Sequence, residues 1–226
     1  MNKPVVSQLM AGVKPIPPGL AEARRAAYNQ MMTEREISPS PPPSWLTGQV
    51  LLAMPSLRDP RFAQGVIFIC AHNEEGAMGL MLNRQLRKPK FGDLMQQLNV
   101  EPNPPQRELP MGQGGPVEDH RGFVLHSADW IGEGSLNVDG DHVLSASMDV
   151  LQAIARGEGP EKARLLLGYS GWGAGQLEDE IRQNSWLNVP ADDAILFDAN
   201  YQRKWQRGLA KLKIDPGMLS GDAGQA

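Results

Sequence analysis

The sequence is poor in cysteine, in aromatic side chains and in long apolar runs. Only one of its 226 residues, Cys70, is a cysteine, and aromatic residues make up 6%. A single cysteine cannot form an internal disulfide and excludes zinc sites built from several cysteines. No apolar run approaches the roughly 20 residues that cross a bilayer, and prolines interrupt the N-terminal stretch where a signal peptide needs a continuous apolar core. These absences predict a cytoplasmic protein with no membrane partner.

The sequence also lacks an excess of positive charge. Its formal net charge is −4, and residues 1–44 carry +2 while the remainder carries −6. Nucleic-acid affinity comes largely from cations that neutralise phosphates, and no helix-turn-helix pattern stands out. The composition therefore disfavours nucleic acid as a partner.

A proline-rich segment divides the chain. "ISPSPPPSWL" (Ile37–Leu46) has four prolines and three serines in ten residues, a composition typical of a stiff linker. We therefore expect residues 1–44 to form an N-terminal extension and residues 45–226 to form one compact domain, which is long enough to bury a single core.

Hydrophobic periodicity in this domain predicts both strands and helices. Met148, Leu151 and Ile154 share one helical face, and Ser145 or Ser147 could cap that helix before Gly157 ends it. Strands are expected over residues 48–54, 65–71, 77–83, 121–126 and 163–170, the second and third as a hairpin; further helices are expected over residues 91–98, around 177–181 and over 199–213. The pattern predicts an α+β fold with a mixed, curved sheet or partial barrel flanked by helices.

The most distinctive motif is "LLLGYSGWGAGQLEDEI" (Leu165–Ile181). A nucleophile elbow needs glycine two residues before and two after its serine, and Trp172 occupies the second position. A dinucleotide-binding loop needs a third glycine where Gln176 stands. We favour a structural turn in which Trp172 packs against the sheet; Tyr169 and Ser170 would contact any ligand that binds there.

A second glycine cluster, "MGQGGPVE" (Met111–Glu118), could aim the amides of Gln113 to Gly115 at an anion, but a connecting loop that turns sharply needs the same residues, and we favour the loop. The two glycine clusters could line one cleft. The candidate ligand-binding residues are Gly114, Gly115, His126, Tyr169, Ser170, Gly171, Trp172 and Gly173. The four histidines are scattered and no metal-binding or cofactor motif is present, so we expect neither a metal nor a cofactor.

Two further features have ordinary structural explanations. Cys70 lies in an apolar run, where an unpaired cysteine is typically buried, has a raised pKa and is a poor nucleophile. The amphipathic stretch 199–213 is basic on one side and could bind a membrane or an acidic partner. Its apolar stripe is more typical of a helix packed on a core.

Five blocks together resemble the AlgH/YqgE family of bacterial proteins. They are Gly48–Arg84, "GQGGPV" (Gly112–Val117), "FVLHS" (Phe123–Ser127), Leu165–Ile181 and "SWL" (Ser185–Leu187). The resemblance covers about Trp45 to Trp205 and implies a compact cytoplasmic α/β-type domain. The family carries a label of transcriptional regulator from genetic association and supplies no agreed catalytic residues.

Three functions follow from these observations. The leading hypothesis is a non-enzymatic regulatory or ligand-binding protein, whose partner is an unidentified small molecule or protein. The alternative is a hydrolase with Ser170 as nucleophile and His126 as base, which requires the two side chains to lie within hydrogen-bond reach. A DNA-binding transcriptional regulator ranks third.

Overall fold

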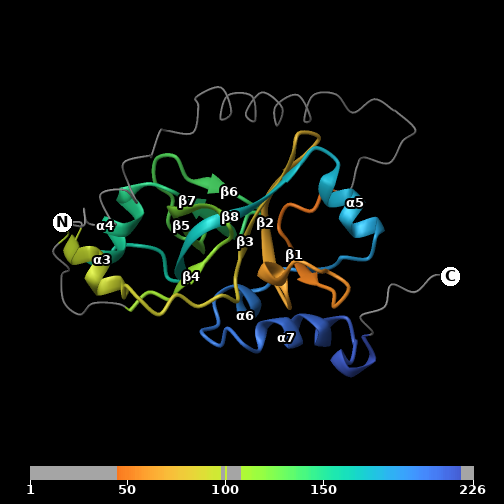
Figure 1. The fold of residues 1–226 in the computed structure, drawn as a ribbon. Coiled ribbons are helices and arrows are strands. Elements are labelled where there is room, and N and C mark those ends of the chain that lie inside the picture. The colour runs from red at the N-terminus through yellow and green to blue at the C-terminus, as the bar shows by residue number, and fades with distance from the viewer. Residues whose placement is uncertain (1–44, 98–99, 101–107, 220–226) are drawn as a thin grey trace, which may run out of the picture.

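The computed structural model describes residues 45–97, 100 and 108–219 of the chain. The expected N-terminal extension, residues 1–44, lies outside this part. Nine strands of the described chain form one curled sheet, and helices pack around it (Figure 1). All strand pairs are antiparallel except one, so the sheet is mixed. The predicted α+β fold with a mixed, curved sheet is confirmed.

Each expected strand and helix of the domain is present, together with five further strands and helices that were not predicted. The strands are β1 (Gln49–Ala53), β2 (Val66–Asn73), β3 (Gly76–Met81), β4 (Met111–Gln113), β5 (Val117–Ser127), β6 (Leu136–Asn137), β7 (His142–Ser145), β8 (Ala163–Gly173) and β9 (Trp186–Pro190). The helices are α3 (Phe91–Gln97), α4 (Met148–Arg156), α5 (Gln176–Arg182), α6 (Asp193–Leu196) and α7 (Lys204–Lys211), with 3-10 turns η1 (Pro60–Phe62) and η2 (Pro216–Met218). The predicted β2–β3 hairpin is present, and the elements that were not predicted are β4, β6, β7, β9 and α6.

Strand β8 is the central strand of the sheet. The strand order is β6-β7-β5-β8-β3-β2-β1-β9, and β4 adds to β8 in parallel. The run Leu165–Leu167 is apolar because elements cover it on both faces. The strand continues to Gly173, three residues beyond the predicted end at Ser170, because Gly171 and Gly173 pair with β3.

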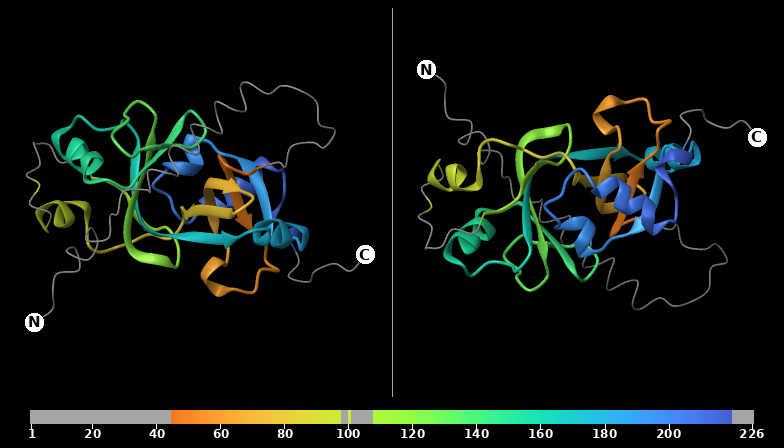
Figure 2. Two further views of the ribbon diagram at one scale, coloured as in Figure 1. Left: turned by 90° about the horizontal axis from the view of Figure 1, so that it is seen from above. Right: turned by 90° about the horizontal axis from the view of Figure 1, so that it is seen from below.

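Three apolar clusters hold the helices against the sheet. Helices α3 and α4 bury Leu94 and Ile154 against one end, and α5 buries Leu177 beside Trp172 at the other. The largest cluster lies between the sheet and α6 and α7, where Trp205 is buried. Figure 2 shows this separation, with α3 and α4 at one end of the molecule and α5 at the opposite end. The helices therefore cover the apolar side chains that project from the faces of the sheet.

Helix α4 ends as the sequence predicts but begins differently. Gly157 takes the left-handed conformation (φ 77°) that terminates a helix. Ser147 occupies the N-cap position, but its hydroxyl accepts no capping hydrogen bond. The hydroxyl of Ser145 bonds to His126 instead. The predicted stop is confirmed, and the predicted side-chain cap is wrong.

Helix α7 belongs to the core. It is shorter than the predicted segment 199–213, but Trp205 and Leu209 are buried as expected. On its polar side, Arg207 pairs with Asp198 at 2.5 Å and Lys211 pairs with Asp192 at 2.8 Å. Among the described residues, no helix has the length and hydropathy needed to span a bilayer.

Candidate functional site

The two glycine clusters meet, and they meet through their backbones. Beyond β4, the amide of Gly114 donates to the carbonyl of Leu167 at 2.6 Å, and its carbonyl accepts from Met81 at 2.7 Å. A Cβ on Gly115 would lie 2.1 Å from the carbonyl carbon of Tyr169. Only glycine fits such an approach. The chain after β4 thus fills the split between β3 and β8.

This junction uses the amides that were candidates for an anion nest. The amide of Gln113 donates to the carbonyl of Arg84 at 2.9 Å, and that of Gly114 is engaged with β8. An anion nest needs successive amides aimed at the ligand. The anion nest considered for Gln113–Gly115 is therefore not formed, in line with the structural loop that the sequence favoured.

Ser170 lies within β8 and does not occupy a turn. Its side chain is buried, and Oγ donates to the carbonyl of Gly114 over 3.5 Å. A nucleophile elbow instead exposes its serine on a sharp turn between a strand and a helix. The geometry of an elbow is absent.

The residues next to Ser170 along β8 lie in different environments. The ring of Tyr169 packs edge-on against Phe123, with centroids 6.0 Å apart. Gly171 is exposed on the strand, and Gly173 pairs with Gly76 at its end. Trp172 is buried against Trp186, and both indole N–H groups donate to one carboxylate oxygen of Glu180, at 2.9 and 2.7 Å respectively. Trp172 is buried as expected, but the structural turn favoured for this motif is wrong at residues 168–173, which belong to β8; the chain turns only at Ala174 and Gly175.

His126 lies far from Ser170 along the sheet. It pairs with Ala163 across the β5–β8 ladder, seven residues from Ser170, a separation of roughly 23 Å along an extended strand. Its Nδ1 bonds to the carbonyl of Ser127 at 2.9 Å, which leaves Nε2 to accept from Ser145 Oγ at 2.8 Å. The Ser170–His126 pair required by the hydrolase alternative is not formed.

A different polar chain surrounds His126. Ser145 Oγ lies 2.7 Å from Ser135 Oγ, and Ser135 Oγ accepts the amide of Gly132 at 3.1 Å. Burial lowers the pKa of His126, against the smaller raising effects of the Ser127 carbonyl and Asp129. The buried imidazole is therefore neutral at pH 7 and its hydrogen-bonding capacity is satisfied.

A pocket opens beside the junction of the glycine clusters. Its volume is about 200 Å³, and its lining residues are Pro60, Arg61, Met81, Arg84, Gln113, Gly115 and Pro116. Of the candidate residues, Gly115 lines this pocket, and Gly114 bonds through its carbonyl to the amide of Met81, which also lines it. The pocket thus joins the second glycine cluster to two loops that the sequence analysis did not select.

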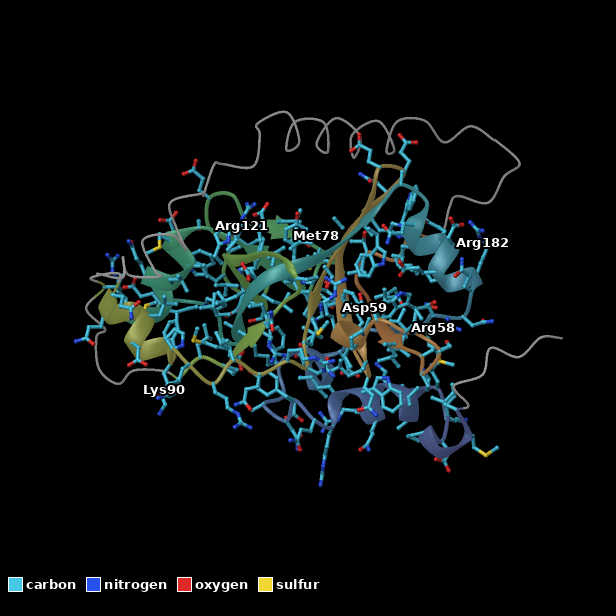
Figure 3. All side chains as sticks on the ribbon, viewed as in Figure 1. Arg58, Asp59, Met78, Lys90, Arg121 and Arg182 are labelled. Carbon is cyan, nitrogen blue, oxygen red and sulfur yellow. The ribbon has the colours of Figure 1, made fainter. Side chains whose placement is uncertain are left out.

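The two arginines of the pocket differ in their partners. Arg61 forms a forked ion pair with Asp59, with contacts of 2.6 to 3.1 Å. The Arg84 guanidinium donates through Nη2 to the carbonyl of Ala63 at 2.6 Å and, over 3.4 Å, to that of Arg61. Burial lowers the pKa of Arg84, but a guanidinium remains charged at neutral pH. Figure 3 shows Asp59 beside Arg58 on the segment between β1 and β2.

The described part of the chain offers neither a reactive cysteine nor a metal site. Cys70 is fully buried in β2, as predicted, and desolvation strongly raises the pKa of its thiol, which disfavours the nucleophilic thiolate. Within the described ranges, no group of three or more His, Cys, Asp or Glu side chains is placed to hold a metal ion.

Comparison with known proteins identifies the family. The model of the family described as AlgH-like matches residues 50–217. The chain belongs to the AlgH-like family. The matched region contains the complete pocket, because the lining residues run from Pro60 to Pro116.

Several AlgH-like proteins match most of the chain. A UPF0301 protein of Gluconobacter oxydans is 50% identical over 183 residues, which cover 80% of this chain and 98% of that protein. A UPF0301 protein of Nitrobacter hamburgensis is 45% identical over 214 residues, covering 91% and 99% respectively. The solution structure of the AlgH protein from Pseudomonas aeruginosa matches with a TM-score of 0.66 and 42% identity, over 84% of this chain and all of that one.

A more distant structure supports the fold alone. A crystal structure of a protein from Corynebacterium diphtheriae matches with a TM-score of 0.60 at 20% identity, over 84% of this chain and 93% of that one. The AlgH-like sheet is thus retained where most of the sequence differs.

Proposed function

We propose that this AlgH-like domain is a non-enzymatic regulatory protein of the cytoplasm that binds a small anionic ligand in the Arg84 pocket, the cavity lined by Arg61, Arg84, Gly115 and their neighbours. The observation that carries the proposal is the guanidinium of Arg84. It is partly buried at the pocket, and its hydrogen bonds within the described chain are to two carbonyl oxygens, through Nη2. Its charge is therefore available to a ligand anion.

The charge balance of the pocket favours one negative charge on the ligand. Asp59 neutralises Arg61, and no described carboxylate lies within ion-pair distance of Arg84. An anion that enters the pocket meets one cation without a paired carboxylate. Its carboxylate or phosphate oxygens can accept from the free N–H groups of the planar guanidinium.

The size and the walls of the pocket limit the rest of the ligand. At about 200 Å³ it is smaller than the roughly 300–1,000 Å³ of pockets for drug-sized molecules. Pro60, Met81 and Pro116 supply apolar wall, and Gln113 supplies an amide. These features favour a metabolite-sized anion with a short apolar portion.

Binding of defined anions tests the proposal. Isothermal titration with a panel of short monocarboxylates and with inorganic phosphate should find at least one that binds with saturation. Arg84→Met, which retains the unbranched aliphatic part of the side chain and removes the guanidinium, should weaken that binding by about 10- to 100-fold, the value of a charged hydrogen bond. Arg58→Met is the matched control: it removes the same charge from an exposed residue of the neighbouring loop that does not line the pocket.

Two results would oppose the proposal. If no member of the panel binds, or if Arg84→Met and Arg58→Met bind with equal affinity, the pocket is not an anion site. Calorimetry detects the heat of binding and does not require turnover, so it also detects ligands that are not substrates.

The remaining functions have weaker support. Ser170 bonds to a backbone carbonyl and His126 bonds to Ser145, which disfavours the hydrolase. The acidic domain pairs Arg207 and Lys211 of α7 with aspartates, which disfavours direct DNA binding. We expect any complex with DNA to be weak and to dissociate at moderate salt, and a salt-resistant, sequence-specific complex in fluorescence anisotropy would reverse this ranking.

A further inference from the structure

Two cations lie inside the molecule, away from the Arg84 pocket. Arg164 on β8 and Lys204 at the start of α7 are both fully buried. Their side chains converge on the C-terminal end of α6: Arg164 Nη1 donates to the carbonyl of Leu196 at 2.5 Å, and Lys204 Nζ donates to that of Ile195. Adjacent carbonyls hold both groups, so the two positive charges lie close together.

Neither cation has a carboxylate of its own. Asp198 is near enough for its charge to act on both, but it forms its ion pair with Arg207 at 2.5 Å. The guanidinium of Arg164 lies over the ring of Tyr201, 5.0 Å from its centroid. The ring face and the carbonyl dipoles are partial compensation for two charges removed from water.

The hydrogen bonds of Arg164 are incomplete. Its Nε and Nη2 atoms are buried, and neither forms a hydrogen bond within the described part of the chain; the Tyr201 hydroxyl, which is near enough to favour the charge of Arg164, donates to the carbonyl of Met111 at 3.0 Å. Buried polar groups nearly always have a partner, and an orphaned donor on a charged group is especially costly. Burial, with a smaller effect from the charge of Arg164, lowers the pKa of Lys204 to about 7.

We propose that Arg164 and Lys204 together hold one small monovalent anion of halide type. The anion would accept from Nε and Nη2 of Arg164 and from Nζ of Lys204, and it would offset the repulsion between the two cations. A halide fits better than a phosphate because the neighbouring cluster side chains Leu125, Leu166 and Leu196 are apolar and cannot donate to the additional oxygens of a phosphate. The anion is a structural component of the fold, separate from the ligand of the Arg84 pocket.

Anion-dependent stability is the first test. The full chain should unfold at a higher temperature in sodium chloride or bromide than in sodium gluconate at equal ionic strength, with a rise of about 3 °C that saturates. Arg164→Met should abolish the difference between chloride and gluconate. Arg84→Met should retain it, because that substitution affects only the pocket. Equal melting temperatures of the wild type in chloride and gluconate would overturn the proposal.

Crystals of the wild type in bromide give a second test that does not depend on a variant that folds. We expect an anomalous peak within hydrogen-bond distance of Arg164 Nε or Nη2 and of Lys204 Nζ. A water molecule at that position, or bromide bound only elsewhere, would contradict the assignment. Loss of anion binding in the Arg84 pocket with a retained bromide peak would reject the proposed function and leave this inference intact.

Discussion

The two halves of β8 form one strand but differ in composition and in what holds them in the sheet. The first half, Ala163–Leu167, is apolar apart from Arg164 and is flanked by β5 and β4, as expected for a strand covered on both faces. The second half, Gly168–Gly173, contains three glycines and resembles a loop in sequence. Its glycines serve close backbone approach: a Cβ on Gly168 would lie 2.5 Å from the carbonyl oxygen of Gly115. A cluster of glycines can therefore mark a junction between strands and not only a turn.

The second half of β8 is anchored by one large side chain, and its removal should have the largest effect. Trp172→Ala should lower the free energy of unfolding by about 3–5 kcal/mol, because a buried indole packed on Trp186 would leave a cavity. Urea denaturation measures this change. Trp172→Phe should retain most of the packing and lose mainly the hydrogen bond to Glu180, about 1 kcal/mol. Equal losses in the two variants would mean that the hydrogen bond, and not the buried ring, anchors the strand.

The same contrast explains how far the sequence predicts the structure. The β2–β3 hairpin and the stop at Gly157 depend on local periodicity and on a backbone conformation that favours glycine, so both were predictable. The strand character of Gly171 and Gly173 depends on pairing with a distant strand, which local composition does not report. Long-range pairing outweighed the loop-like composition.

The candidate site was predictable only in part, for a related reason. Gly115 was selected from its cluster, but Arg61 and Arg84 lie on two other loops and carry no motif of their own. Their convergence is held by long-range hydrogen bonds from Arg84 to the carbonyls of Arg61 and Ala63. His126 was selected from its residue type, and the β5–β8 register determines that its partner is Ser145. A sequence provides no measure of that register.

Substitutions of glycine should distinguish the junction from an ordinary turn. Gly168 has φ +71° and meets the Gly115 carbonyl, so Gly168→Ala should cost roughly 2–4 kcal/mol from backbone strain and overlap together. Gly175 is the matched control: its φ is +72°, but nothing lies within 4 Å of an added Cβ. Gly175→Ala should therefore cost only about 1–2 kcal/mol. Equal losses on thermal or urea unfolding would show that the close approach of the two backbones is unimportant.

His126 lies on β5 beside the first half of β8, and it should make the free energy of unfolding depend on pH. Burial lowers its pKa in the folded protein, whereas the unfolded chain has a pKa of about 6.5. Between these two values the unfolded state binds more protons, so the free energy of unfolding decreases as pH falls below about 6.5 and levels off below the folded pKa. His126→Gln should flatten this dependence in urea titrations between neutral pH and mild acid. His120→Gln, at an exposed histidine, should leave the pH dependence of unfolding unchanged. If His120→Gln flattened that dependence and His126→Gln did not, His126 would not be its source.

Ser170 should give the smallest effect, although it is the residue most like a nucleophile. Its hydroxyl makes one long hydrogen bond of 3.5 Å to Gly114, so Ser170→Ala should cost about 0.5 kcal/mol, the low end for such a bond. Because the side chain is buried and His126 is bonded to Ser145, a fluorophosphonate should leave Ser170 unmodified in intact-mass measurements. Stoichiometric labelling that disappears in Ser170→Ala would establish an activated serine and favour the hydrolase. Labelling that maps to the partly exposed Ser135 would instead indicate that the His126–Ser145–Ser135 chain activates a hydroxyl, at the opposite end of β8 from the glycine-rich motif.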